Sequence, residues 1–173
     1  MSPAPLDPRN PGHYREALGA VPTSVAIIAT VTEDGPAGVA VGSFVSVSLD
    51  PPLVGFFIAH SSTTWPRIRP TGGFSASVLS ATQEAVCRVF ATRGADKFGE
   101  CAWSGAPSGR PVIDGAVAWF DCEIESASQA GDHDLVLGRV EAMHVDQEAE
   151  PLVFMGGAYG RAIAFPKRSN EWE

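Results

Sequence analysis

The sequence predicts a mainly β domain, an antiparallel barrel of six to seven strands with a few short helices. Runs of apolar and β-branched residues recur along the chain, turn residues separate them, and helical spacing is confined to short segments. The 173 residues are 45% hydrophobic and 18% charged, which suits one packed domain rather than a disordered chain. We therefore expect a single hydrophobic core, with no linker dividing the chain.

The first part of the chain predicts a helix followed by a β-hairpin. A helix is expected over residues 10–19, because its asparagine is a good N-cap and its proline suits the first helical position. Residues 25–31 form a β-rich run that stops at turn residues 33–36. Residues 39–49 are expected to form one continuous second strand that pairs with the first.

The remaining strands are predicted from apolar runs and from alternation of apolar and polar residues. Residues 53–59 are continuously apolar, which indicates a strand that is buried on both faces. Ser80 and Gln83 resemble a capping box and predict a short helix, in which Val86, Val89 and Phe90 fall at helical spacing. The predicted strands are residues 53–59, 74–79, 117–125, 135–145 and 152–155.

Charge and composition exclude several classes of protein. The formal net charge is −8, which opposes binding to a nucleic acid. No apolar run approaches the roughly 20 residues that span a bilayer, and the N-terminus does not resemble a signal peptide. Three scattered cysteines fit reduced thiols, so we expect a cytoplasmic protein without a membrane segment.

Several catalytic motifs are absent from the sequence. There is no GxGxxG after a strand, no P-loop and no HExxH, and no nucleophile elbow is found. The histidines are scattered, and only His133 and His144 could meet across strands. Asp132 and Asp134 flank His133. Because no tight ligand spacing supports a metal ion, we expect no metal site.

Two segments carry most of the functional information. Residues 42–54 form a strand rich in serine, valine and glycine that runs into a double proline and a second apolar strand. Small side chains leave backbone amides approachable, which suits the binding of a flat polar ring. The second segment is the turn Gly131-Asp132-His133.

These segments belong to an ordered set of pieces that resembles the flavin reductase family, the NAD(P)H-dependent partners of two-component flavin monooxygenases. The pieces span about residues 14–161, and an ordered set is more specific than any single motif. In chain order they are residues 25–30, 38–54, 61–65, 74–79 with Gln83 and Phe90, 96–98, 120–123, 131–133 with Gly138, and 151–154 with Tyr159.

The resemblance implies an FMN-binding split β-barrel, a Greek-key barrel that forms a homodimer with the flavin near the dimer interface. The isoalloxazine is expected along the strand from Ala40 to Ser48, where serine hydroxyls and amides meet the polar edge of the ring. Fixed donors there would stabilise the charge of the reduced flavin. The alternative is that the serines form the exposed face of an ordinary strand. The expected binding residues of this strand are Ala40, Val41, Gly42, Ser43, Ser46, Val47 and Ser48.

The resemblance also places the flavin phosphate near the segment that follows residues 53–59. Neutral hydroxyls and free amides there would form an anion nest, and Arg67, Arg69 or Lys97 could supply charge. A helix-capping or loop role for Ser62 and Thr63 is the alternative. The expected binding residues of this segment are His60, Ser61, Ser62, Thr64 and Trp65, with Lys97 on the phosphate or adenylate side. Ser77, in the strand over 74–79, is expected near the flavin.

The nicotinamide is expected beside His133, with Tyr159 helping the cofactor to stack. Hydride transfer needs no protein base, so no residue is expected to act as acid or base, and His133 would position the nicotinamide. Family members often carry Thr at the position of Ala40, Asn at that of Ser77 and an aromatic residue at that of Met155. These departures leave the choice between FMN and FAD open.

The sequence therefore predicts an NAD(P)H:flavin oxidoreductase that supplies reduced FMN or FAD to a separate monooxygenase. NADH is slightly favoured over NADPH, because no arginine pair for a 2′-phosphate is evident. The alternatives are a flavin carrier or redox sensor without turnover of free flavin, and an enzyme that retains its flavin. We expect an N-terminal extension over residues 1–12, the reductase domain over 13–165 and a tail over 166–173.

Overall fold

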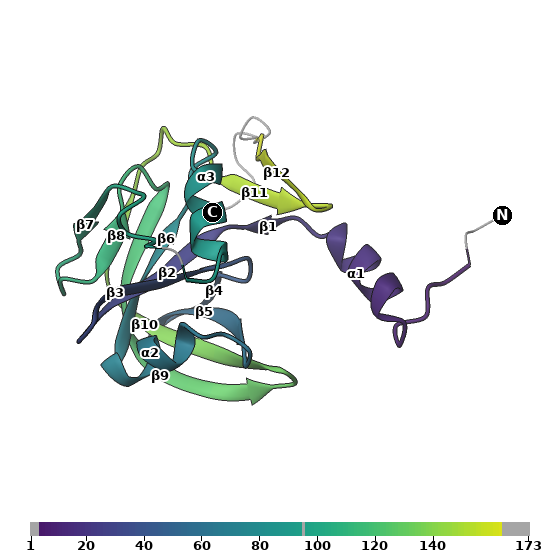
Figure 1. Cartoon of the computed structure of the whole chain (residues 1–173), viewed down its shortest axis with the longest axis horizontal. Helices are drawn as coiled ribbons and strands as arrows, with labels where there is room; N and C mark the ends of the chain where they lie inside the picture. The colour runs from purple at the N-terminus through teal and green to yellow at the C-terminus, as the bar shows by residue number, and fades with distance from the viewer. Residues whose placement is uncertain (1–3, 95, 164–173) are drawn as a thin grey trace.

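A seven-stranded antiparallel sheet dominates the computed structural model, which describes residues 4–94 and 96–163 (Figure 1). The strand order is β3-β2-β6-β9-β10-β5-β4. This mainly β, antiparallel fold confirms the predicted class, and the tail expected over 166–173 lies outside the described residues. The strands are β2 Ala26–Thr32, β3 Gly35–Val41, β4 Val45–Leu49, β5 Pro52–Ala59, β6 Gly73–Val78, β9 Ala118–Ala130 and β10 His133–Val145.

Smaller elements surround the sheet, and most of them are too short to show a periodic pattern in the sequence. A three-stranded sheet contains β1 Thr23–Ser24, β11 Leu152–Met155 and β12 Ala158–Arg161, and a hairpin contains β7 Trp103–Gly105 and β8 Pro111–Ile113. Of these strands the sequence predicted only β11. The helices are α1 Pro11–Gly19, α2 Trp65–Ile68, the 3-10 turn η1 Arg69–Thr71, and α3 Glu84–Ala91. None of the described helices is long and apolar enough to cross a membrane.

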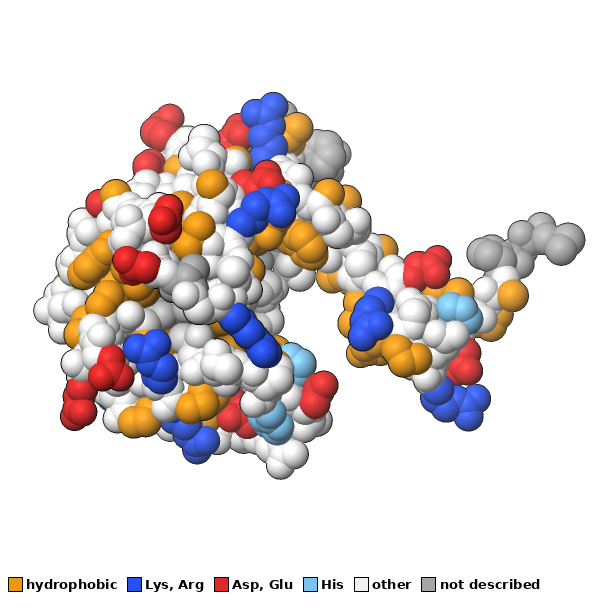
Figure 2. Space-filling model, in the orientation of Figure 1, with side chains coloured by type: hydrophobic (Ala, Val, Ile, Leu, Met, Phe, Trp, Pro, Cys, Tyr) orange, Lys and Arg blue, Asp and Glu red, His pale blue; other side chains and the backbone are white. Residues whose placement is uncertain are grey.

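Helix α1 has the predicted cap but lies apart from the core. Asn10 Oδ1 accepts hydrogen bonds from the amides of Gly12 (2.9 Å) and His13 (3.4 Å), as an N-cap should. The helix buries none of its residues, and Tyr14 and Leu18 are exposed. Figure 2 shows it standing out from the body of the molecule.

The predicted strand over residues 39–49 is wrong, because two strands occupy this segment. β3 ends at Val41 and pairs with β2, whereas β4 pairs with β5 at the opposite edge of the sheet. Between them Ser43 Oγ accepts a hydrogen bond from the Phe57 amide (2.9 Å) and donates one to the Phe57 carbonyl (3.1 Å). A side chain thus replaces ladder bonds and ties the end of β3 to β5, so the sheet curls into a split barrel.

Strand β5 is also less buried than its apolar sequence indicates. The side chains of Val54, Phe56 and Ile58 are buried on one face. On the other face Phe57 is 43% exposed, so burial on both faces is wrong for this strand.

The start of α3 differs from the predicted capping box. Gln83 Oε1 accepts a hydrogen bond from the Ser80 amide (2.9 Å), which is one half of the box. The Ser80 hydroxyl instead contacts Thr82 Oγ1, and the helix begins at Glu84 with Gln83 as N-cap.

The core consists of two clusters on opposite faces of the sheet. Phe56 is in edge-on contact with both Trp65 of α2 (6.0 Å between centroids) and Phe74 of β6 (5.1 Å) inside the barrel. The second cluster contains Leu79, Phe90 of α3 and Phe98. β2 contributes alternate side chains to both clusters, which explains why its residues are almost continuously apolar.

A buried ionic network fastens the β7–β8 hairpin to the sheet. Asp121 of β9 is 2% exposed. It accepts hydrogen bonds from Arg110 Nη1 (3.0 Å) and from the amide (3.0 Å) and hydroxyl (2.8 Å) of Ser108. Arg110 also pairs with Glu123 (2.8 Å). Each buried charge therefore has its partner, which its burial requires.

We expect D121A to lower the free energy of unfolding by about 3 kcal/mol, because it leaves the buried Arg110 guanidinium short of a partner. The measurement is urea unfolding followed by circular dichroism. E84A is the control, since Glu84 and Arg88 form an exposed pair on α3, and it should cost less than about 0.5 kcal/mol. Equal small effects for the two variants would contradict the network's importance.

We expect G138A to destabilise the barrel by about 1–3 kcal/mol through overpacking. A Cβ at Gly138 would collide with the ring of Phe74 and lie 3.1 Å from Cys122 Cβ. G160A, where a Cβ meets nothing within 4 Å, is the control in the same unfolding experiment. A wild-type midpoint for G138A would show that the Phe74 ring can move aside.

Candidate functional site

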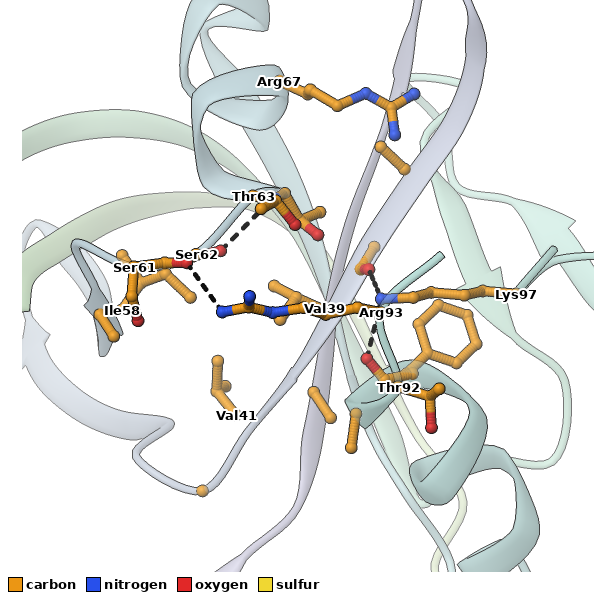
Figure 3. Close-up of a pocket in the computed structure, with 18 of the residues that line it drawn as sticks. Val39, Val41, Ile58, Ser61, Ser62, Thr63, Arg67, Thr92, Arg93 and Lys97 are labelled. Atoms are coloured by element: carbon orange, nitrogen blue, oxygen red, sulfur yellow. Dashed lines mark hydrogen bonds between the residues drawn. The ribbon is translucent and has the colours of Figure 1, made fainter. Parts of the chain in front are cut away.

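A cavity of about 880 Å³ opens between β3, the loop from β5 to α2, and the C-terminal end of α3 (Figure 3). This volume lies in the range of about 300–1,000 Å³ that is typical of ligand pockets. Segments far apart in the sequence meet here. Among its lining residues are Val39, Ala40, Val41, Gly42, Ser43, Ile58, Ser61, Ser62, Thr63, Thr64, Arg67, Thr92, Arg93, Lys97 and His133.

One wall of the cavity is the apolar end of β3. Val39, Ala40 and Val41 line it. The chain leaves β3 after Val41 and crosses from there to β4 at the other edge of the sheet. A Cβ on Gly42 would lie 3.1 Å from Thr23 Oγ1, so the chain passes closest to β1 where it has no side chain. The Ser43 hydroxyl, expected to meet a ring, already bonds both polar groups of Phe57.

The opposite wall is the hydroxyl-rich loop of residues 60–64. Ser62 Oγ accepts hydrogen bonds from the amides of Thr64 (3.3 Å) and Trp65 (3.1 Å), and the Ser62 amide donates to Ala59 (2.9 Å). These amides are therefore not free to form the expected nest, and Ser62 has the loop role that was one alternative, since the N-cap of α2 is Thr64. Within the described ranges, the Ser61 and Thr63 amides have no hydrogen bond to another protein group.

Cationic side chains lie around the cavity although the whole chain is acidic. Arg67 comes from α2 and Arg93 from the segment after α3, and neither forms an ion pair with a carboxylate in the part of the chain that the structure describes. Arg93 reaches across the cavity, where its Nη2 donates to the Ser61 carbonyl (3.3 Å, Figure 3). Arg93 was missed in the sequence, since a lone arginine after a helix carries no signal.

Lys97 has a mainly structural position. Its Nζ donates to the carbonyls of Gly38 (3.1 Å) and Phe90 (2.9 Å), which joins β3 to α3. Burial lowers the pKa of Lys97, and the nearby Arg67 adds to this effect. Lys97 lines the cavity but has only one remaining donor.

His133, the first residue of β10, lines the cavity as expected near its rim. Its Nδ1 lies 2.7 Å from Asp132 Oδ1, a hydrogen bond that lowers the pKa of Asp132. Tyr159 does not line this cavity. Its hydroxyl contacts Cys87 Sγ (3.2 Å) and its ring lies 5.0 Å from the Arg88 guanidinium, so it packs against α3 instead.

Asp134 joins two of the expected residues. His60 Nε2 lies 3.0 Å from Asp134 Oδ1, and Trp65 Nε1 donates to Asp134 Oδ2 (3.2 Å). The hydrogen bond from His60 is the main cause of a lowered pKa for Asp134. His60 and Trp65 therefore flank the loop rather than line the cavity, and Asp134 was considered in the sequence only as a neighbour of His133.

Four other expected residues lie away from the cavity. Ser77 is buried in β6 and accepts a hydrogen bond from the Ile113 amide (3.0 Å). Ser46, Val47 and Ser48 lie in β4 at the far edge of the sheet, because the chain breaks after Val41 instead of continuing as one strand.

The histidines considered for a metal ion do not meet. His133 and His144 stand at opposite ends of β10, where His144 stacks on Trp119. In the described ranges no group of three His, Cys, Asp or Glu side chains is placed to hold a metal ion.

The donor set of the cavity fits an amphipathic phosphorylated ligand such as a flavin nucleotide. The apolar β3 wall suits a ring, and the hydroxyl-rich loop with Arg67 and Arg93 suits an anionic group. Two guanidinium groups without carboxylate partners, in a chain of net charge −8, indicate where an anion would find compensating charge.

Comparisons with known proteins agree with this interpretation. Residues 18–162 match the family described as flavin reductase like domain. The chain is 44% identical to a flavin reductase of Pseudomonas putida over 152 residues, which cover 87% of this chain and 89% of the relative. It is 42% identical to an FMN reductase (NADH) of Agrobacterium fabrum over 88% of this chain and 86% of the relative.

A solved structure shows the same fold. The NADH:FAD oxidoreductase of Streptomyces globisporus, in complex with NAD and FAD fragments, superimposes with a TM-score of 0.86 and 32% identity. The match covers 97% of this chain and 100% of that one. From the matched domain and these relatives, we conclude that the chain belongs to the flavin reductase family.

Proposed function

We propose that this protein is an NADH-dependent flavin reductase that transfers a hydride from the nicotinamide to FMN or FAD and releases the reduced flavin. The observation that supports this most directly is the cavity, where an apolar strand end faces a hydroxyl-rich loop and two arginines. The Agrobacterium relative is named for NADH and FMN, and the Streptomyces relative for NADH and FAD, which supports NADH as donor.

The residues of the cavity divide the work of binding. Val39 to Gly42 of the β3 wall would hold the flavin ring, and Ser61, Thr63 and the two arginines would hold its phosphate. His133 at the rim would position the nicotinamide. When bound, the flavin would supply the redox chemistry as the acceptor of the hydride. The protein contributes orientation and charge, and it needs no residue that exchanges a proton.

A partner oxygenase and a second copy of the chain complete the proposal. A relative in Rhodococcus jostii, 38% identical, is named the reductase subunit of a flavin-dependent monooxygenase, and we propose a similar role here. The edge formed by β4 and β5 exposes Val45, Val47, Leu49 and Phe57. Exposed apolar side chains in one patch are typical of an interface, which supports the proposed homodimer.

The deciding experiment is NADH oxidation by the purified protein with and without added FMN or FAD. Oxidation that saturates with free flavin and is negligible without it supports the reductase, and the same titration identifies the preferred flavin. A flavin that co-purifies and stays bound without turnover would overturn the proposal and favour a carrier or sensor.

We expect R93Q to raise the KM for flavin by about tenfold, the loss typical of one charge-assisted hydrogen bond, while kcat changes little. R139Q is the matched control, because Arg139 lies on β10 away from the cavity and pairs with Glu141. Steady-state NADH oxidation over a range of FMN concentrations measures both parameters. Equal KM values for the two variants would exclude Arg93 from flavin binding.

We expect H133N to raise the KM for NADH more than it lowers kcat, because His133 positions the nicotinamide and takes no part in proton transfer. H144N, at the other end of the same strand, controls for loss of an imidazole. The measurement is initial rate against NADH concentration at saturating flavin. A lower kcat with unchanged KM would argue against a positioning role.

A further inference from the structure

The loop that carries the hydroxyl groups of the cavity is held at both ends by one carboxylate. His60, directly after β5, and Trp65, the first residue of α2, bond to opposite oxygens of Asp134 at 3.0 and 3.2 Å. The His60 amide also donates to the Asp132 carbonyl (3.0 Å). Asp134 therefore links the two ends of the segment 60–65.

Two of the three partners in this bridge, Asp134 and Trp65, are anchored independently. Asp134 lies opposite Ile58 in the ladder between β10 and β5, so the barrel fixes its backbone. The indole of Trp65 is 5% exposed and packs on Phe56 in the core. The Asp134 side chain is 17% exposed, so water competes only partly for its oxygens.

Between the anchors the other restraints on the loop are mostly local. Ser62 Oγ accepts hydrogen bonds from the Thr64 and Trp65 amides, and the Ser62 amide donates to the Ala59 carbonyl (2.9 Å). Across the cavity, Arg93 donates to the Ser61 carbonyl. The positions of the Ser61 and Thr63 groups thus depend on where residues 60 and 65 are held. Small displacements of binding groups cost affinity because they lengthen several hydrogen bonds together.

We propose that Asp134 is a positioning residue for flavin binding, which fixes the Ser61–Thr64 segment through His60 and Trp65 without touching the ligand. The inference rests on the proposed function of the cavity. For the removal of Asp134, this positioning role predicts a change in flavin affinity opposite to the change that charge alone predicts. Removing a carboxylate beside an anion site should tighten phosphate binding through charge alone, whereas loss of the bridge should weaken it.

The test compares D134A with D134N and with E141A. The last variant removes a carboxylate on the same strand that pairs with exposed Arg139. FMN binding is measured by quenching of flavin fluorescence, and KM and kcat by NADH oxidation. D134A should raise the Kd and KM for FMN by about fivefold, the loss typical of one to two hydrogen bonds, with kcat nearly unchanged. E141A should match the wild type.

D134N provides the rescue, because an amide can accept from the Trp65 indole and donate to a ring nitrogen of His60. It should restore the Kd to within about twofold of the wild type. W65F, which removes the indole donor but keeps an aromatic ring beside Phe56, should weaken binding less than D134A. The double variant D134A/W65F should bind FMN as weakly as D134A alone, since both cut the same bridge.

The outcomes separate this inference from the proposed function. If the wild type neither binds nor reduces FMN or FAD, the proposed function fails. If the wild type binds and reduces one of them while D134A binds that flavin equally or more tightly, the positioning role is wrong. A thermal unfolding scan accompanies each variant, and if D134A proves unstable, the comparison of D134N and W65F with the wild type decides the question.

Discussion

The architecture depends on the crossing at residues 42–44, where the chain passes from one edge of the sheet to the other. Both edge strands, β3 and β4, belong to this one continuous segment, and Ser43 ties it to Phe57 of β5. An open sheet would leave both edges as long rows of unpaired groups. The crossing instead curls the sheet around Phe56 and Phe74, and it leaves the end of β3 facing the loop that follows β5.

One strand register, that between β5 and β10, therefore helps to form both the barrel and the cavity. The ladder between β5 and β10 sets Ala59 opposite His133 and Ile58 opposite Asp134. The same pairing that closes the barrel therefore delivers His133 to the cavity rim and Asp134 to the base of the hydroxyl-rich loop. A shift by one residue would exchange the two faces of the strand and place Asp134 where His133 stands.

Positively charged side chains line the cavity although the molecule as a whole is acidic. The chain carries a net charge of −8, yet Arg67 and Arg93 line the cavity without carboxylate partners among the described residues. Elsewhere Arg110 is neutralised by buried Asp121 and by Glu123. This contrast distinguishes a cation that stabilises the fold from the two that the proposed function assigns to an anionic ligand.

The fold class, the pairing of the first two strands of the sheet and the capped N-terminal helix could be predicted from the sequence, because apolar periodicity, turn residues and caps are local signals. The ordered motifs also placed Ala40 to Ser43, Ser61, Ser62, Thr64, Lys97 and His133, all of which line the cavity. The break of residues 39–49 into two strands at opposite edges could not be predicted, since small β-forming residues continue through the break.

The tertiary structure also decided the roles of single polar residues. Ser77, Trp65 and Tyr159 are engaged within the protein, whereas Arg93 and Asp134 act on a loop that lies distant from them in sequence. Composition identifies a donor or an acceptor but not its partner. The partner depends on strand register and chain crossing, which are set by packing over the whole barrel.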